Sequence, residues 1–344
     1  MCESNTPSTG RACRTPVLKT GAVTGPLSLP YPDSSSHPFF TNSGILVPMT
    51  ARTFAYQQLD VFTNQPLQGN MLAVFTDARG LSDAEMQAIA KETNLSETTF
   101  ILPRDAETEA REGVKVRIFT VEEELQFAGH PTLGTAYLLH QSDDSDQVTL
   151  DLKVGKIPVT FTRDAQGLAF GEMRQRDPEF GQVHDDAVAI ARIAGIRLDD
   201  IDASLPIQTV STGMPFVIVP IRTLAALRNL RFNWQAASDY LAKTDGKFFY
   251  FVSEETEQKT SSLHARMIFY NGEDPATGSA AGCCAAWAVQ HGVVASDAQA
   301  IIEQGIEMKR ASYIHFRATK RNESVSNVRV GGHCVKVSDA TLSF

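Results

Sequence analysis

The chain has 344 residues, of which 42% are hydrophobic and 21% are charged, a composition typical of a globular protein. This length allows two domains or one large two-part fold. The net charge of −9 and the lack of a clustered basic run argue against a nucleic-acid partner. Because no stretch approaches 18 consecutive apolar residues, we also expect no membrane insertion.

The five cysteines give no sign of a disulfide framework or a zinc site. Cys2, Cys13, Cys283, Cys284 and Cys334 are odd in number and form no CxxC pair. A reducing cytoplasm is therefore the expected compartment.

The first fifty residues differ in composition from the rest. Residues 1–50 are rich in Ser, Thr, Pro and Gly and lack both an apolar period and the apolar core of a secretory signal. This predicts a disordered N-terminal extension. Met49 stands just before strand-like sequence. Translation starting at Met49 and a genuine flexible tail both fit, and the sequence leaves the two open.

The first half of the remaining chain alternates between short strands and single helices. The expected elements, in order, are strands at 53–62 and 71–75, a helix from 82 to 94, strands at 98–102 and 114–119, and a helix from 131 to 140. Ser82 followed by Glu85 is a capping box, which sets the start of the first helix.

After the helix at 131–140, the chain continues with short strands and helices, and strands are more frequent than before. The pattern predicts strands near 147–153, 156–163 and 167–173, a helix near 185–194, strands near 207–211 and 215–220, helices near 222–229 and 234–243, strands near 247–253 and 263–269, a helix at 275–291, and strands near 299–303, 312–318, 326–331 and 333–337. The segment 276–288 is small or apolar on nearly every side, which is typical of a helix buried all round.

A helix buried all round needs surrounding strands to cover it. We therefore predict an α+β fold of two similar halves, each a strand-rich barrel wrapped round one buried central helix. The expected boundaries are 51–172 for the first half-barrel domain and 173–337 for the second, with residues 338–344 returning to the first.

Two short segments match each other without gaps. Residues 129–136 align on residues 273–280, and the alignment places His130 over Asp274, each directly before a proline. Proline is favoured at the first position of a helix, so the residue before it should be the N-cap. The match predicts two helices whose N-termini face one cleft and hold a small anionic substrate beside acid–base groups.

The candidate acid–base residues each have a structural alternative. Asp274 could act only as an N-cap, because aspartate is among the best capping residues. Histidine is not a favoured cap, and the helix dipole would keep His130 neutral and able to transfer a proton. Glu97 lies between a helix end and a strand, where glutamates are usually solvated but where active sites also form.

Several common motifs are absent from the sequence. There is no GxGxxG after a strand, no GxxxxGK[ST] and no HExxH. The serine in Gly278-Ser279 directly follows its glycine and does not fit a nucleophile elbow. We therefore expect neither a nucleotide cofactor nor a metal.

Taken together, six motifs in this order are distinctive. They are Leu59–Thr63, Gly69-Asn70, Asn94–Thr98, Arg117–Thr120, Phe127–Gly134 and Glu273–Ala280. Over about residues 53–344 the chain resembles the PhzF-like family, the phenazine-biosynthesis isomerase group. One departure is Met71, which stands where the family commonly has proline.

The resemblance implies a diaminopimelate-epimerase-like fold, catalysis without cofactor or metal, and a homodimer. It implies that Glu97 is the main acid–base group and that His130 and Asp274 are its polar partners. It also implies that four further residues line the substrate site: Ser96, Gly129, Gly278 and Ser279.

The resulting hypothesis is an isomerase that moves a proton within a small carboxylate-bearing substrate. Ionised Glu97 would take the proton from one carbon and return it to another. The best-known activity of the family is on trans-2,3-dihydro-3-hydroxyanthranilate. The alternatives are an epimerase or racemase on the same scaffold and a non-catalytic member that binds a small acid or a protein. Related racemases carry cysteines where this chain has His130 and Asp274, which disfavours a two-thiol mechanism.

Overall fold

The computed structural model describes residues 51–269 and 272–344, and residues 51–344 form one compact unit. The extension predicted for residues 1–50, with Cys2, Cys13 and Met49, lies outside the described residues.

The described chain has a strand or helix at each predicted position, and it also has short elements at 106–112, 124–125, 179–183, 198–200 and 272–274 that the sequence did not indicate. Its first part contains β1 (Thr53–Val61), β2 (Asn70–Phe75), α1 (Asp83–Thr93), β3 (Glu97–Ile101), α2 (Ala106–Glu112), β4 (Val114–Phe119), β5 (Glu124–Leu125), α3 (Gly129–Asp143), β6 (Gln147–Leu152), β7 (Gly155–Arg163) and β8 (Ala169–Arg174). It continues with β9 (Glu179–Val183), α4 (Ala187–Ala194), the 3₁₀ turn η1 (Leu198–Asp200), β10 (Gln208–Ser211), β11 (Pro215–Pro220), α5 (Leu224–Arg228), α6 (Trp234–Leu241), β12 (Phe248–Ser253) and β13 (Leu263–Phe269). The last elements are β14 (Gly272–Asp274), α7 (Gly278–Gln290), β15 (Ala300–Gln304), β16 (Ser312–Arg321), β17 (Ser324–Gly332) and β18 (Cys334–Ser343).

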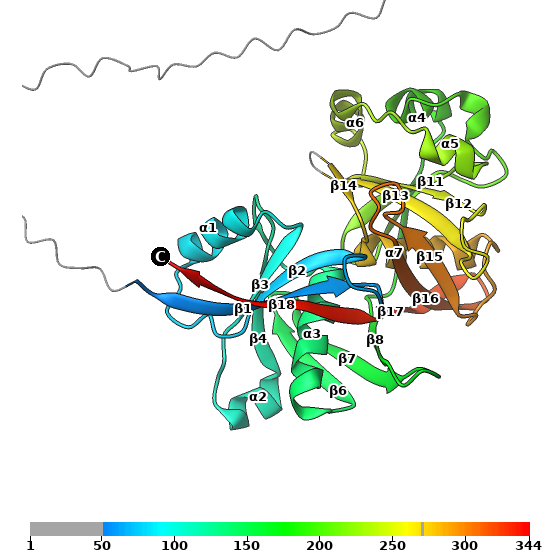
Figure 1. The fold of residues 1–344 in the computed structure, drawn as a ribbon. Coiled ribbons are helices and arrows are strands. Elements are labelled where there is room, and N and C mark those ends of the chain that lie inside the picture. The colour runs from blue at the N-terminus through cyan, green and yellow to red at the C-terminus, as the bar shows by residue number, and fades with distance from the viewer. Residues whose placement is uncertain (1–50, 270–271) are drawn as a thin grey trace, which may run out of the picture. The chain divides into compact units, whose positions relative to one another are not determined.

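Helix α3 is the central helix of the first half (Figure 1). It packs against β1, β2, β3, β6, β7, β8 and β18. Its first eight residues, Gly129–Ala136, are all buried. Gly134 allows this packing, because a Cβ there would lie 2.7 Å from Leu72 Cδ2 and 2.8 Å from Val61 Cγ2.

Helix α7 has the corresponding place in the second half (Figure 1). It packs against β10, β11, β16 and β17, and every residue of α7 except Ser279 and Gln290 is buried. The prediction of a helix buried all round is therefore confirmed, and with it the α+β fold of two similar halves. Small side chains on all faces let strands approach from every side.

The two halves are joined by pairing between strands far apart in sequence. β18 returns to lie antiparallel to β1, and β17 pairs antiparallel with β8. β8 itself crosses the predicted boundary at 172/173. The division into domains at 51–172 and 173–337 stays a prediction.

The prediction of the helix starts is right for α1 and wrong for the two central helices. Ser82 and Glu85 form the expected capping box. In contrast, the N-cap of α3 is Ala128 and that of α7 is Thr277, so neither His130 nor Asp274 is a cap. The reason is that the carbonyls of Ala128 and Thr277 accept the first helical hydrogen bonds, from the N–H groups of residues 132 and 281.

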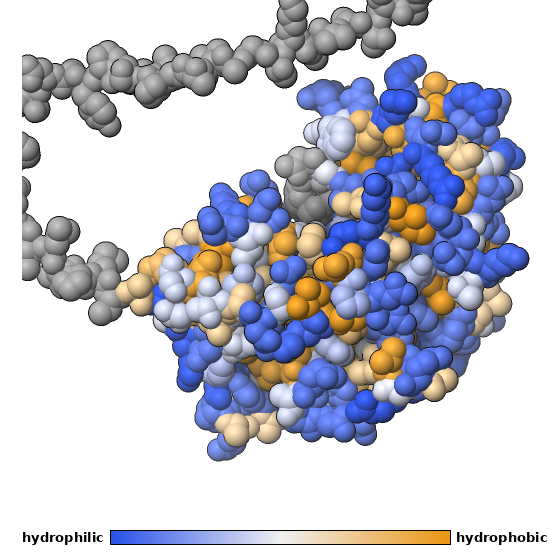
Figure 2. Space-filling model, viewed as in Figure 1, coloured by the Kyte–Doolittle hydropathy of each residue, from blue (hydrophilic) through white to orange (hydrophobic). Residues whose placement is uncertain are grey.

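The visible surface of the compact unit is mostly hydrophilic, with apolar residues in scattered groups (Figure 2). Among the helices of the described residues, none combines the length and apolar character needed to cross a bilayer.

The first residues of α3 and α7 touch through their backbones. A Cβ on Gly129 would lie 2.8 Å from Gly278 Cα and 3.0 Å from Ser279 N, and a Cβ on Gly278 would lie 3.1 Å from Gly129 Cα. Only glycine on both sides permits this approach. The two helix N-termini are thereby held together, as the matched segments predict.

We expect Gly129→Ala to destabilise the protein by about 2 kcal/mol, because the new methyl group meets backbone atoms that no side-chain rotation can move away. Urea unfolding followed by circular dichroism measures this. Gly272→Ala is the matched control, because a Cβ there would have no atom within 4 Å. Equal stability of both variants and the wild type would contradict a tight contact between the helix starts.

Candidate active site

Three predicted acid–base residues meet beside the joined helix starts. Glu97 is the first residue of β3, His130 is the second residue of α3, and Asp274 ends β14. All three line one small pocket. Their residues are only 7%, 3% and 8% exposed, so the sequence-based alternative of a solvated Glu97 is wrong.

Asp274 is held by donors from three directions. Its Oδ1 accepts hydrogen bonds from Asn70 Nδ2 at 2.8 Å and from Ser96 Oγ at 3.3 Å, while Oδ2 accepts from Thr277 Oγ1 at 2.6 Å. Asn70 Nδ2 also donates to the Ala276 carbonyl and lies 3.2 Å from His130 Nδ1. The Asp274 carboxyl is therefore fixed in orientation.

Gln304 on β15 orders the turn between Asp274 and α7. Its Nε2 donates to the Asp274 carbonyl at 2.8 Å and to Thr277 Oγ1 at 3.0 Å, and its Oε1 accepts from Thr277 N at 3.3 Å. If Asp274 were the N-cap, its side chain would accept a hydrogen bond from the Thr277 N–H. Gln304 Oε1 accepts that hydrogen bond instead. Because Thr277 Oγ1 accepts from Gln304, its hydroxyl proton is directed to the Asp274 carboxyl.

Glu97 and His130 face each other without a hydrogen bond. His130 Nε2 lies 3.4 Å from Glu97 Oε2, yet both atoms are buried and lack a hydrogen-bond partner among the described residues. Buried polar atoms are nearly always paired. These two atoms are therefore available to polar atoms of a bound molecule.

The electrostatics of the site come from burial. Desolvation, reinforced by the charge of Asp274, raises the pKa of Glu97 well above its ordinary value. Burial raises the pKa of Asp274 to about 6, against the opposing hydrogen bonds from Thr277, Asn70 and Ser96. Burial lowers the pKa of His130 to about 3, although a hydrogen bond with the Met71 backbone opposes this shift.

These shifts assign the state of His130 at neutral pH and the order in which the two carboxyls ionise. His130 is neutral, so its contact with Glu97 is not an ion pair. Asp274 is the carboxyl that ionises first, because it has donors that stabilise its charge, whereas no group in the described part of the chain donates to Glu97. Glu97 is therefore the carboxyl that holds its proton to the higher pH.

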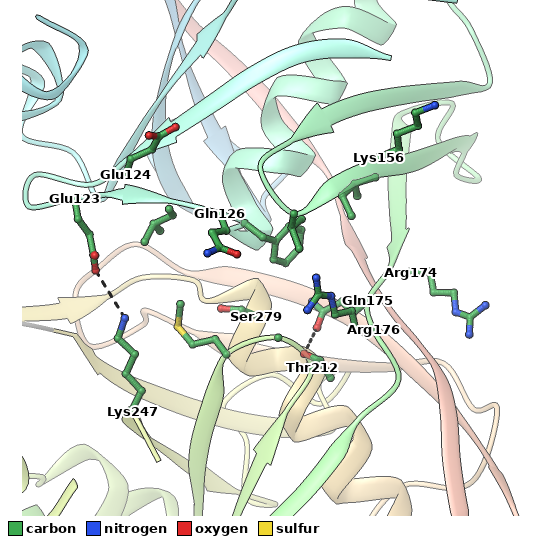
Figure 3. Close-up of a pocket in the computed structure, with 16 residues that line it drawn as sticks. Glu123, Glu124, Gln126, Lys156, Arg174, Gln175, Arg176, Thr212, Lys247 and Ser279 are labelled. Carbon is green, nitrogen blue, oxygen red and sulfur yellow. Dashed lines mark hydrogen bonds and ion pairs between the residues drawn. The ribbon is translucent and has the colours of Figure 1, made fainter. Parts of the chain in front are cut away.

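The pocket at the acid–base cluster lies next to a much larger chamber. The inner pocket has a volume of about 20 Å³, room for one water molecule. The neighbouring chamber has a volume of about 550 Å³ (Figure 3). Four residues line both spaces and separate them: Leu125, Phe127, Met214 and Ser279.

The residues predicted to bind substrate have different places. Gly129 and Gly278 line the inner pocket, and Ser279 lines both spaces. Ser96 instead contacts Asp274 from behind and does not line either space.

Sequence reasoning missed three residues of the cluster as site residues: Asn70, Thr277 and Gln304. The Gly69-Asn70 pair was a signal for the first, because a fully buried asparagine at a strand start needs partners. Gln304 left no signal, since it comes from a strand remote in sequence.

The described cysteines do not join the site chemistry. Cys283, Cys284 and Cys334 are buried, and burial raises the pKa of each thiol, that of Cys283 to about 11. They are therefore protonated and pack as small apolar residues. Within residues 51–269 and 272–344, no three His, Cys, Asp or Glu side chains are arranged as metal ligands.

Two half-barrels, each around a buried helix and joined at their helix starts, define the diaminopimelate-epimerase-like fold. The sequence matches the PhzC-PhzF family, described as phenazine biosynthesis-like protein, over residues 59–340. The chain belongs to this family.

Several of the proteins similar to this chain are named isomerases. An uncharacterized isomerase of Mesorhizobium japonicum is 37% identical over 85% of this chain and 99% of its own length. The trans-2,3-dihydro-3-hydroxyanthranilate isomerase of Pseudomonas aeruginosa is 34% identical over 81% of this chain and 95% of its own. This chain is accordingly a PhzF-like enzyme of the isomerase class.

Solved structures agree with this fold. A PhzF-family phenazine biosynthesis protein from Bacillus anthracis has a TM-score of 0.77 and 28% identity, covering 85% of this chain and 99% of that one. A predicted epimerase from Pseudomonas aeruginosa has a TM-score of 0.71 and 35% identity, covering 84% and 99%. A hydroxyproline epimerase from Agrobacterium vitis, at 10% identity, coverage of 85% and 93%, and a TM-score of 0.59, shares the fold.

The raised pKa of Glu97 predicts a pH-dependent cost in stability. Below the ordinary glutamate pKa the carboxyl is protonated in both states, and there is no cost. As pH rises, the unfolded state loses this proton while the folded state retains it, so folding becomes less favourable up to the folded pKa. Glu97→Gln removes this loss.

We therefore expect Glu97→Gln to melt near the wild-type temperature at about pH 4 and a few degrees above it at about pH 8. Differential scanning calorimetry across this range measures the difference. A variant that is less stable than the wild type at the higher pH would contradict a buried, poorly compensated carboxyl at position 97.

Proposed function

We propose that this chain moves a proton within a small carboxylate-bearing substrate without a cofactor, as a relative of the trans-2,3-dihydro-3-hydroxyanthranilate isomerases. The observation that carries the proposal is the position of Glu97: a buried carboxyl with an unpartnered oxygen, beside neutral His130 and at the pocket between two helix starts.

Glu97 is suited to accept and return the same proton. A carboxyl at its ordinary pKa is a weak base at neutral pH and does not hold a proton long enough to deliver it elsewhere. The raised pKa of Glu97 makes both protonation states accessible. Because the inner pocket holds only about one water molecule, the removed proton would have little opportunity to exchange before it is returned.

The partners of Glu97 would stabilise charge on the substrate. Neutral His130 offers a ring nitrogen that can hydrogen-bond a substrate heteroatom as electrons shift. Ionised Asp274 would balance positive charge on the substrate or accept a hydrogen bond from it. The first turns of α3 and α7, with Ser279 at the boundary of the chamber, would hold the substrate carboxylate.

Glu97→Gln tests this role, with trans-2,3-dihydro-3-hydroxyanthranilate as the first substrate assayed. We expect kcat to fall at least about 100-fold, because an amide cannot take up the proton. Glu122→Gln, at an exposed glutamate, is the control and should retain wild-type kcat. A Glu97→Gln enzyme with wild-type turnover would overturn the proposal.

Solvent deuterium separates the proton shuttle from free exchange. In D₂O we expect substantially less than one deuterium per product at the carbon that gains hydrogen, since the pocket shelters the transferred proton. Mass spectrometry of the product measures this. Complete labelling in the first turnover would show that solvent, rather than the substrate, supplies the proton.

An epimerase or racemase activity has less support from the site. The thiols of α7 are buried and protonated, and the positions beside the helix starts hold His130 and Asp274. We also propose that the chain is a homodimer, as the family resemblance implies, which analytical ultracentrifugation would test.

A further inference from the structure

The chamber outside the acid–base cluster is large enough to hold most of a substrate. Its volume of about 550 Å³ lies within the range of small-molecule binding sites, whereas the inner pocket admits only the reacting atoms. Whatever part of the substrate is remote from Glu97 therefore lies in the chamber, and the side chains there determine which substrates fit.

Most charges on the chamber wall are already compensated. Lys156 lies 3.1 Å from Glu112, Arg174 lies 3.0 Å from Asp177, and Lys247 lies 3.8 Å from Glu123. A further acidic residue of the wall, Glu124, pairs with Arg117 and Lys153, each at 2.7 Å. These side chains leave little net charge for a bound molecule.

Arg176 is the exception on this wall. It lines the chamber and has no hydrogen bond or ion pair with any side chain or backbone group in the described chain. In Figure 3 the guanidinium of Arg174 points away from the middle of the chamber, whereas Arg176 lies near Gln175 and Thr212. One cation is therefore uncompensated where substrate would sit.

The position of Arg176 is fixed by the residue before it. Gln175 is 5% exposed, donates from Nε2 to the Gly278 carbonyl at 2.8 Å, and accepts from Thr212 Oγ1 at 2.7 Å. The backbone at Arg176 is thus tied to the first residue of α7, beside the proposed carboxylate site. The arginine is exposed at its tip but anchored at its base.

We propose that Arg176 is a specificity residue that binds a second carboxylate of the substrate, so that this enzyme prefers a dicarboxylic acid. The proposal rests on the proposed function, which places the first carboxylate at the helix starts. A guanidinium matches the two oxygens of a carboxylate. A single uncompensated positive charge also matches one carboxylate better than a doubly charged phosphate.

Binding measurements with paired probes test this without knowledge of the natural substrate. The probes are isophthalate, terephthalate and 4-carboxyphenylacetate, each compared with its mono-amide, which has the same shape but one charge fewer. Isothermal titration calorimetry on the full chain gives the ratio of the two dissociation constants. For the wild type we expect at least one diacid to bind about fivefold more tightly than its amide.

Two variants locate the preference. Arg176→Gln should reduce this ratio to about one, and Arg174→Gln, at the paired arginine two residues earlier, should leave it unchanged. The proposal is overturned if no diacid exceeds its amide in the wild type, or if both variants lose the preference equally. Tighter binding of 3-phosphonobenzoate than of isophthalate would overturn the assignment to a carboxylate.

Glu97→Gln separates this proposal from the proposed function. The variant should keep the diacid preference, because binding at Arg176 does not need the proton shuttle. Normal turnover in Glu97→Gln would reject the proton shuttle. The diacid preference would still be decided separately, by the ratio of the dissociation constants of the amide and the diacid. A preference that disappears in Glu97→Gln but persists in Arg176→Gln would overturn the role of Arg176.

Discussion

The contact between Gly129 and Gly278 is the constraint on which the candidate site depends. Two helices from different halves of the fold can begin side by side only because neither has a Cβ at the point of contact. Once the helix starts touch, His130 and Asp274 are brought to one pocket, and Glu97 at the start of β3 completes its wall. The fold thus builds one site from segments that are remote in sequence.

Burial without a nearby cation then sets the chemistry of that pocket. Paired arginines can instead favour the ionised form of a carboxyl, as Glu172 illustrates: burial acts to raise its pKa, but Arg317 at 2.6 Å and Arg329 lower it overall. Glu97 has no arginine or lysine partner within residues 51–269 and 272–344, and its raised pKa makes it a group that can hold a proton. Asp274 differs because Asn70, Ser96 and Thr277 donate to it. Two carboxyls at one site therefore acquire different properties from their hydrogen-bond partners.

The site has an inner and an outer part with different tasks. The inner pocket has room for about one water molecule and is lined by the candidate acid–base residues, which suits a reaction common to a family. The outer chamber is wide and lined by charges from several loops and strands, which suits recognition of one substrate. An enzyme built in this way can keep its chemistry while the chamber residues change.

The sequence by itself determined the central helices and indicated which residues are candidates for acid–base chemistry. Small residues on every face of 276–288 require a helix covered by strands, and the matched segments around His130 and Asp274 require two related helix starts. Local pattern also gave the capping box at Ser82. Glu97 was identified through its family motif, since a loop glutamate has no local feature that predicts burial.

Only the tertiary structure decided how the helices begin and which groups surround the carboxyls. The prolines suggested that His130 and Asp274 are caps, but Gln304 on β15 satisfies the amide of Thr277, and Asp274 is left free to receive side-chain donors. Likewise, Arg176 lacks a partner among the described residues because the nearby acidic side chains pair with other cations. A sequence pattern reports what a residue prefers locally, whereas pairing and burial depend on residues that meet only when the chain has folded.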